Sequence, residues 1–149
     1  MPPAPTALIA LIFYAIWAMI LVLSVGAVRV HQVVRGRADA ASFPSGVPHG
    51  SEPYWRLNRA HMNTIENLPI FATVVLTGWA ADAIDPVFNA LAVAVVAARA
   101  VQSLIHISSG SVRAINFRFT FFAVQIVCQF WMAWLILQAT GVFLTGSSH

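Results

Sequence analysis

Residues 6–28, TALIALIFYAIWAMILVLSVGAV, run for 23 residues without a charged side chain. An α-helix of this length can cross about 30 Å of hydrocarbon, and the run is longer than the apolar part of a cleaved signal peptide. The composition agrees, because 59% of the 149 residues are hydrophobic and 9% are charged, whereas a soluble domain has about 25% charged residues. The sequence therefore predicts an integral membrane protein in a lipid bilayer.

Three more apolar segments follow the first. Pro86 suits the first turn of a helix, and the residues SSGS at 108–111 separate the last two segments. Lipid offers no hydrogen-bond partners, so the backbone of each segment has to pair within itself, as in a helix. We therefore expect an all-α, four-helix transmembrane bundle that forms one domain over residues 1–149. The expected helices are at about 6–34, 55–81, 86–107 and 112–140, with a loop at about 35–54.

Arginine supplies the basic charge of the chain, and it is concentrated on one side of the predicted bundle. The other side holds Asp82 and Asp85 and no arginine. The positive-inside rule then places both basic loops in the cytoplasm and both termini outside. Frequent alanine and arginine without lysine favour a bacterial inner membrane. No basic run with interleaved aromatic residues indicates nucleic-acid binding. The basic side carries Arg29, Arg35, Arg37, Arg56, Arg59, Arg113 and Arg118.

The segment RAHMNTIENLPIF, residues 59–71, places polar side chains inside the second predicted helix. Arg59, Asn63 and Glu66 are spaced by four and three residues, which puts them on one face of a helix. The third helix carries a matching stripe, which consists of Arg99, Gln102 and His106. Since a charge at mid-membrane costs about 2.5–3.5 kcal/mol, and Glu66 and Arg99 lie at similar depth, we expect these two residues to form an ion pair.

Polar groups on all four helices point to the same end of the bundle. Arg29 ends the first helix, and Arg113 and Arg118 lie near the start of the fourth. These groups predict a basic pocket that opens to the cytoplasm and accepts a small polar anion, while an apolar partner arrives from the bilayer. The histidines lack the tight spacing of metal ligands, so no metal site is expected. The alternative is that the expected pair of Glu66 and Arg99 is structural and holds two helices together.

The segment at 59–71 resembles the second-helix signature of the MAPEG family, the membrane-associated proteins in eicosanoid and glutathione metabolism. The resemblance extends over nearly the whole chain and includes VRAINF at the start of the fourth helix. It implies a homotrimer with glutathione bound between adjacent protomers near the cytoplasmic face. It also implies that a set of polar residues forms or supports the glutathione site: Arg29, Arg59, Asn63, Glu66, Arg99 and Arg113.

The fourth helix departs from the eicosanoid-type pattern of an arginine followed four residues later by a tyrosine. Phe117 and Phe121 occupy these positions, and the late tyrosine of the third helix is replaced by His106. A cation near a thiol stabilises its thiolate, so Arg113 or Arg118 would have to serve this role. The departures favour a generic electrophile over a specialised eicosanoid substrate.

Three functions follow from these features. The leading interpretation is a glutathione transferase or peroxidase that acts on apolar electrophiles or lipid hydroperoxides from the bilayer. The second is a membrane protein of the same fold that binds glutathione, or another small anion, without catalysis. The third is a small transporter that uses Glu66 as a switch, because carboxylates inside membranes often have such roles.

Overall fold

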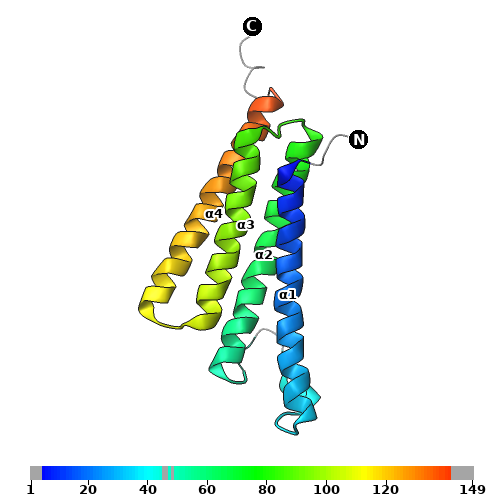
Figure 1. The fold of residues 1–149 in the computed structure, drawn as a ribbon, viewed down its shortest axis with the longest axis vertical. Coiled ribbons are helices and arrows are strands. Elements are labelled where there is room, and N and C mark those ends of the chain that lie inside the picture. Colours follow the sequence, from blue (N-terminus) through cyan, green and yellow to red (C-terminus); the bar gives the residue numbers. More distant parts are fainter. Residues whose placement is uncertain (1–4, 45–46, 48, 142–149) are drawn as a thin grey trace.

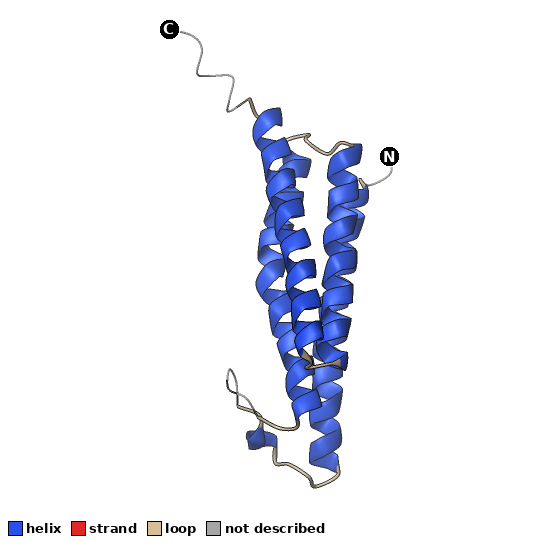
Figure 2. Cartoon of the chain, turned by 90° about the vertical axis from the view of Figure 1, so that its left-hand side faces the viewer, coloured by secondary structure: helices blue, strands red, loops and turns tan. Residues whose placement is uncertain are grey.

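The computed structural model describes residues 5–44, 47 and 49–141. Four long helices run side by side and alternate in direction (Figures 1 and 2). A short 3-10 helix, Ala40–Ser42, lies in the loop after the first helix. The helices are α1 (Thr6–Val34), α2 (Glu52–Ala80), α3 (Pro86–Ser108) and α4 (Val112–Ala139). The expected all-helical fold with four helices is therefore confirmed.

The start of α2 differs from the prediction. The helix begins at Glu52, before the predicted start at Trp55. The sequence analysis placed Pro53 in the loop, because proline usually interrupts helices. Pro53 instead occupies the first turn of α2, where its missing N–H is not needed and its fixed φ suits the helix.

Local hydrogen bonds define the other helix starts. Asp85 accepts a hydrogen bond of 2.7 Å from the backbone N of Phe88 and so caps α3. Ser111 caps α4 in the same way through the backbone N of Ala114, at 3.3 Å. The N-terminus of α1 is satisfied from another helix, because the side-chain oxygen of Asn89 accepts from the backbone N of Ala7 at 2.8 Å. These contacts pair backbone donors that a helix start leaves open.

Three of the four helices, α1, α3 and α4, are long and apolar enough to cross a membrane. The second helix is as long as α1, but the polar residues of segment 59–71 lower its apolar character. Four membrane-spanning helices were expected, and length and composition support three of them. Since α1 and α3 run in the same direction, α2 runs antiparallel to both (Figure 1).

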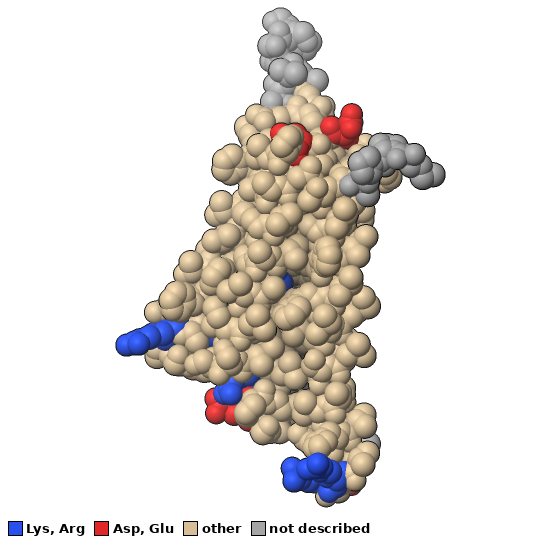
Figure 3. All heavy atoms as spheres, in the orientation of Figure 1, with Lys and Arg blue, Asp and Glu red and all other residues tan. Residues whose placement is uncertain are grey.

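The apolar core and the buried polar groups occupy different parts of the bundle. The largest core side chains are Tyr14, Phe71, Phe88 and Met132. Most buried polar side chains lie between the middle of the bundle and its arginine-rich end, although Gln129 lies beside the apolar core. Of the two predicted polar stripes, that of α3 is buried, whereas Arg59 and Glu66 of α2 are exposed. Figure 3 shows arginines at the lower end and acidic residues at the upper end, with one further acidic patch beside the arginines.

Candidate functional site

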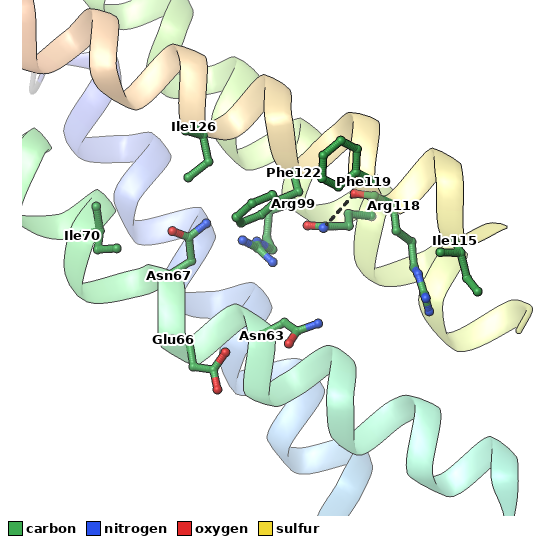
Figure 4. Close-up of a pocket in the computed structure, with 11 residues that line it drawn as sticks. Asn63, Glu66, Asn67, Ile70, Arg99, Ile115, Arg118, Phe119, Phe122 and Ile126 are labelled. Atoms are coloured by element: carbon green, nitrogen blue, oxygen red, sulfur yellow. Dashed lines mark hydrogen bonds between the residues drawn. The ribbon is translucent and has the colours of Figure 1, made fainter. Parts of the chain in front are cut away.

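A cavity of about 430 Å³ lies between α2, α3 and α4. We call it the α2–α4 cavity. Its polar lining comes from all three helices, and its apolar lining is largely exposed on the outer surface of the bundle. The polar lining residues are Asn63, Glu66, Asn67, Arg99, Gln102 and Arg118, and the apolar ones are Ile70, Ile115, Phe119, Phe122 and Ile126. Figure 4 shows these side chains around the cavity.

A chain of amide hydrogen bonds forms part of the cavity wall. The Nε2 of Gln102 donates to the backbone oxygen of Arg118 at 3.0 Å (Figure 4). Its Oε1 accepts from the Nε2 of Gln125 at 3.0 Å, and the Gln125 Oε1 accepts from the Asn67 amide at 3.4 Å. Each helix therefore contributes one amide side chain, and the three amides fix one another's orientation.

Arg99 is 2% exposed and lines the cavity. Its Nε has no hydrogen-bond partner within the described residues. The hydroxyl of Tyr14 donates a hydrogen bond of 3.1 Å to the Thr64 carbonyl, and its oxygen is near enough to interact with the Arg99 guanidinium as well. A buried guanidinium with an open donor is suited to an anion or to another acceptor that enters the cavity.

The expected ion pair between Glu66 and Arg99 is wrong as a direct contact. Among the described residues, the ion pair found is Arg56 with Glu52, at 2.6 Å. Glu66 lines the same cavity as Arg99, but it is exposed at the rim, whereas Asn67 points toward Arg99 (Figure 4). The two residues lie at a similar height along the bundle, but the rotation of α2 turns the carboxylate away from the guanidinium.

The two candidate arginines of α4 lie in different places. Arg118 is half-buried and lines the cavity. Arg113 is exposed in the first turn of α4 and is not among the lining residues. Arg59 is also exposed outside the lining, although its charge acts on Arg118 and on the buried His106. The single pocket expected from sequence therefore contains Arg118 but neither Arg59 nor Arg113 of this chain.

Arg29 lies on the other side of α2. It lines a hollow of about 320 Å³ between α1, α2 and the loop that joins them, which we call the α1–α2 hollow. Asn58, His61 and Met62 of α2 line it too. The Nδ1 of His61 is buried there without a partner in the described part of the chain. His61 lies off the face of α2 that carries Asn63 and Glu66, so the polar stripe in the sequence does not indicate it.

Two further residues of these sites were missed in the sequence. Gln125 was hidden in an apolar run, although a lone amide in a membrane helix usually has a polar partner. Tyr54 was expected in the loop, but it lies in the first turn of α2, where its hydroxyl accepts a hydrogen bond from Nε of Arg29.

No group of three or more potential metal ligands occurs among residues 5–44, 47 and 49–141.

The model of the MAPEG family matches residues 7–138, which is nearly the whole described chain. A comparison with curated proteins found no match. The matched range contains both the α2–α4 cavity and the α1–α2 hollow.

Proposed function

The chain belongs to the MAPEG family, and we propose that it is a glutathione-dependent membrane enzyme of the transferase or peroxidase type. Its substrates would be apolar electrophiles or lipid hydroperoxides that enter from the bilayer. The α2–α4 cavity carries the proposal, because it joins arginine, carboxylate and amide groups to an apolar rim.

Glutathione fits the chemistry of these groups. Its two carboxylates match the hydrogen-bonding forks of arginine, and its ammonium matches a carboxylate such as Glu66. The open donor of Arg99 and the amides Asn63 and Gln102 provide further contacts. When bound, glutathione would supply the thiol that reacts with the electrophile. Arg118 would stabilise the thiolate by its positive charge. The buried His106 lies outside the cavity lining but interacts with Arg118.

The division of the polar residues supports a homotrimer. Arg29 and the α2–α4 cavity lie on different faces of α2, and a helix with its side chains is about 10–12 Å wide. One tripeptide could contact both groups if the α1–α2 face of one protomer met the α3–α4 face of the next. In that arrangement Arg59 and Arg113, which are exposed in a single chain, would complete the site at the protomer contact.

The distribution of arginine supports a proposal for the place of the protein in the cell. The arginine-rich end would face the cytoplasm of a bacterial inner membrane, with all four helices crossing the membrane and both termini outside. Glutathione, which is soluble, would then reach the site from the cytoplasm, and the apolar substrate would reach it from the lipid.

A second candidate is a non-catalytic member that binds glutathione. The phenylalanines at positions 117 and 121 favour it, because no phenol is available on α4 to hold a thiolate.

Titration of the glutathione thiol distinguishes the two candidates. The purified protein with glutathione would be followed by ultraviolet thiolate absorbance against pH, with Arg118→Ala and Arg113→Ala in parallel. An enzyme should show thiolate below the pKa of the free thiol, and Arg118→Ala should remove this effect. Binding without a change in the thiol pKa would favour the non-catalytic member, and absence of binding would refute both.

A further inference from the structure

Aromatic side chains hold the guanidinium of Arg29 in one orientation. The Nε of Arg29 donates a hydrogen bond of 2.7 Å to the hydroxyl of Tyr54, at the start of α2. The guanidinium carbon lies 5.5 Å from the ring centre of Phe43 and 5.9 Å from that of Tyr54. Both distances are within the range of cation–π attraction. Arg29 is therefore held by one hydroxyl and two aromatic rings.

The hydrogen bonds continue from Tyr54 to the loop. The Nδ1 of His49 lies 2.8 Å from the carbonyl oxygen of Val47, and its Nε2 lies 3.3 Å from the Tyr54 hydroxyl. A carbonyl only accepts, so Nδ1 of His49 carries a proton, and in this tautomer Nε2 accepts from the hydroxyl. The Tyr54 oxygen then has its lone pairs free for Arg29. His49 thus orients the Tyr54 hydroxyl so that its oxygen can accept the hydrogen bond from Nε of Arg29.

The backbone at Gly50 is adapted to this cluster. Its φ of +73° lies in the left-handed region, and a Cβ at this position would be 2.8 Å from Cδ1 of Tyr54. Only glycine combines this conformation with so close an approach to the ring without strain. The backbone at Gly50 therefore packs directly against the ring of Tyr54.

The contact with Tyr54 leaves most of the Arg29 guanidinium available. A guanidinium has five N–H donors, and the one on Nε is used for Tyr54. No hydrogen bond from the terminal nitrogens occurs within the described residues, and Arg29 lines the α1–α2 hollow beside Asn58 and His61. Fixing Nε orients the two terminal nitrogens, which is the geometry that a carboxylate can bind in a fork.

We propose that Tyr54, oriented by His49, is a positioning residue that directs the terminal nitrogens of Arg29 toward a carboxylate of glutathione. The inference rests on the proposed function. It assigns a role to the loop before α2, since His49 and Phe43 act on Arg29 from that loop. Neither residue would contact glutathione or the reacting thiol.

Tyr54→Phe is the direct test, because it removes the hydroxyl and keeps the ring. Glutathione affinity would be measured by calorimetry on the full-length protein, and turnover at saturating glutathione would be measured alongside. Loss of one hydrogen bond to a charged group should raise Kd by about tenfold and change the saturated rate by less than about twofold. If Tyr54→Phe fails to fold, His49→Ala decides, with an expected rise in Kd of about threefold.

Arg29→Lys separates positioning from a general structural role. Lysine keeps the charge but has no fork, so adding Tyr54→Phe to Arg29→Lys should change Kd by less than about twofold. Arg35→Lys, at the end of the same helix, is the matched control and should retain the wild-type Kd.

If Tyr54→Phe lowered the affinity for glutathione equally in the wild-type protein and in the Arg29→Lys variant, the positioning role would be overturned. Wild-type affinity in Tyr54→Phe, or in His49→Ala where that variant decides, would also overturn it and leave the proposed function intact. A wild-type protein that binds no glutathione would overturn both proposals.

Discussion

Replacing Gln125 with leucine tests whether the buried amides stabilise the bundle. Gln125 is fully buried on α4, and its Nε2 donates to Gln102 on α3 at 3.0 Å and to the backbone oxygen of Phe121 at 2.8 Å. Its Oε1 accepts from Asn67 on α2 at 3.4 Å. Leucine is similar in size and removes all three bonds, while it leaves the amides of Gln102 and Asn67 without this partner.

The expected loss is about 1 kcal/mol in the free energy of unfolding. Hydrogen bonds between membrane helices contribute about 0.6 kcal/mol each on average, and Gln125 makes two of them. Leaving two buried polar groups unpaired could cost about 1–3 kcal/mol each. The smaller figure should hold here, because Gln102 and Asn67 line the α2–α4 cavity, where water can replace the lost partner.

The control is Gln129→Leu, one helical turn along α4. Gln129 is 4% exposed, and its Nε2 has no partner among the described residues. Leucine at this position removes a buried unpaired donor, so stability should stay unchanged or rise by up to about 1 kcal/mol. Both variants would be unfolded reversibly with sodium dodecyl sulfate in mixed micelles and followed by circular dichroism. Equal losses in both variants, or no loss in Gln125→Leu, would refute this account of the amides.

Three other predictions concern contacts elsewhere in the bundle. Gly78→Ala should lower the free energy of unfolding by about 1–3 kcal/mol, since its Cβ would lie 2.5 Å from Cζ of Phe88; Gly26→Ala, where a Cβ meets nothing within 4 Å, is the control and should not destabilise. Asn89→Ala should cost about 1 kcal/mol in the same assay, because it removes the acceptor for the backbone N of Ala7; an unchanged unfolding curve would contradict this capping role. Glu66→Gln and Arg99→Gln should have nearly additive effects on unfolding, because the Glu66 charge acts on Arg99 without a direct ion pair; a coupling above about 0.5 kcal/mol would show that the two side chains pair directly.

The number and extent of the helices could be predicted because the signals are local. Apolar runs, the proline at position 86 and the SSGS turn each act within a few residues of their own position. Position along the bundle axis was also predictable, since every helical residue adds about 1.5 Å along the axis. Glu66 and Arg99 accordingly line one cavity. The start of α2 was misplaced because Pro53 both interrupts a helix and suits its first turn.

The rotation of each helix about its own axis could not be predicted in the same way. It depends on how the side chains of neighbouring helices fit together, and a single sequence contains that information only indirectly. Asn63 and Glu66 were correctly assigned to one face of α2, but that face turns the carboxylate away from Arg99. Arg29 was expected beside them and lies instead with Asn58 and His61.

The exposed position of Glu66 gives a physical reason for assembly. The residue is exposed at the cavity rim, about ten residues or roughly 15 Å along α2 from Arg56. A charge that faced lipid at such depth would cost about 2.5–3.5 kcal/mol. A second protomer that covered the rim would remove this cost and could bring its own arginines to the carboxylate. In the proposed homotrimer, the contact that hides Glu66 from lipid is therefore the same contact that completes the glutathione site, so assembly and glutathione binding would depend on one surface.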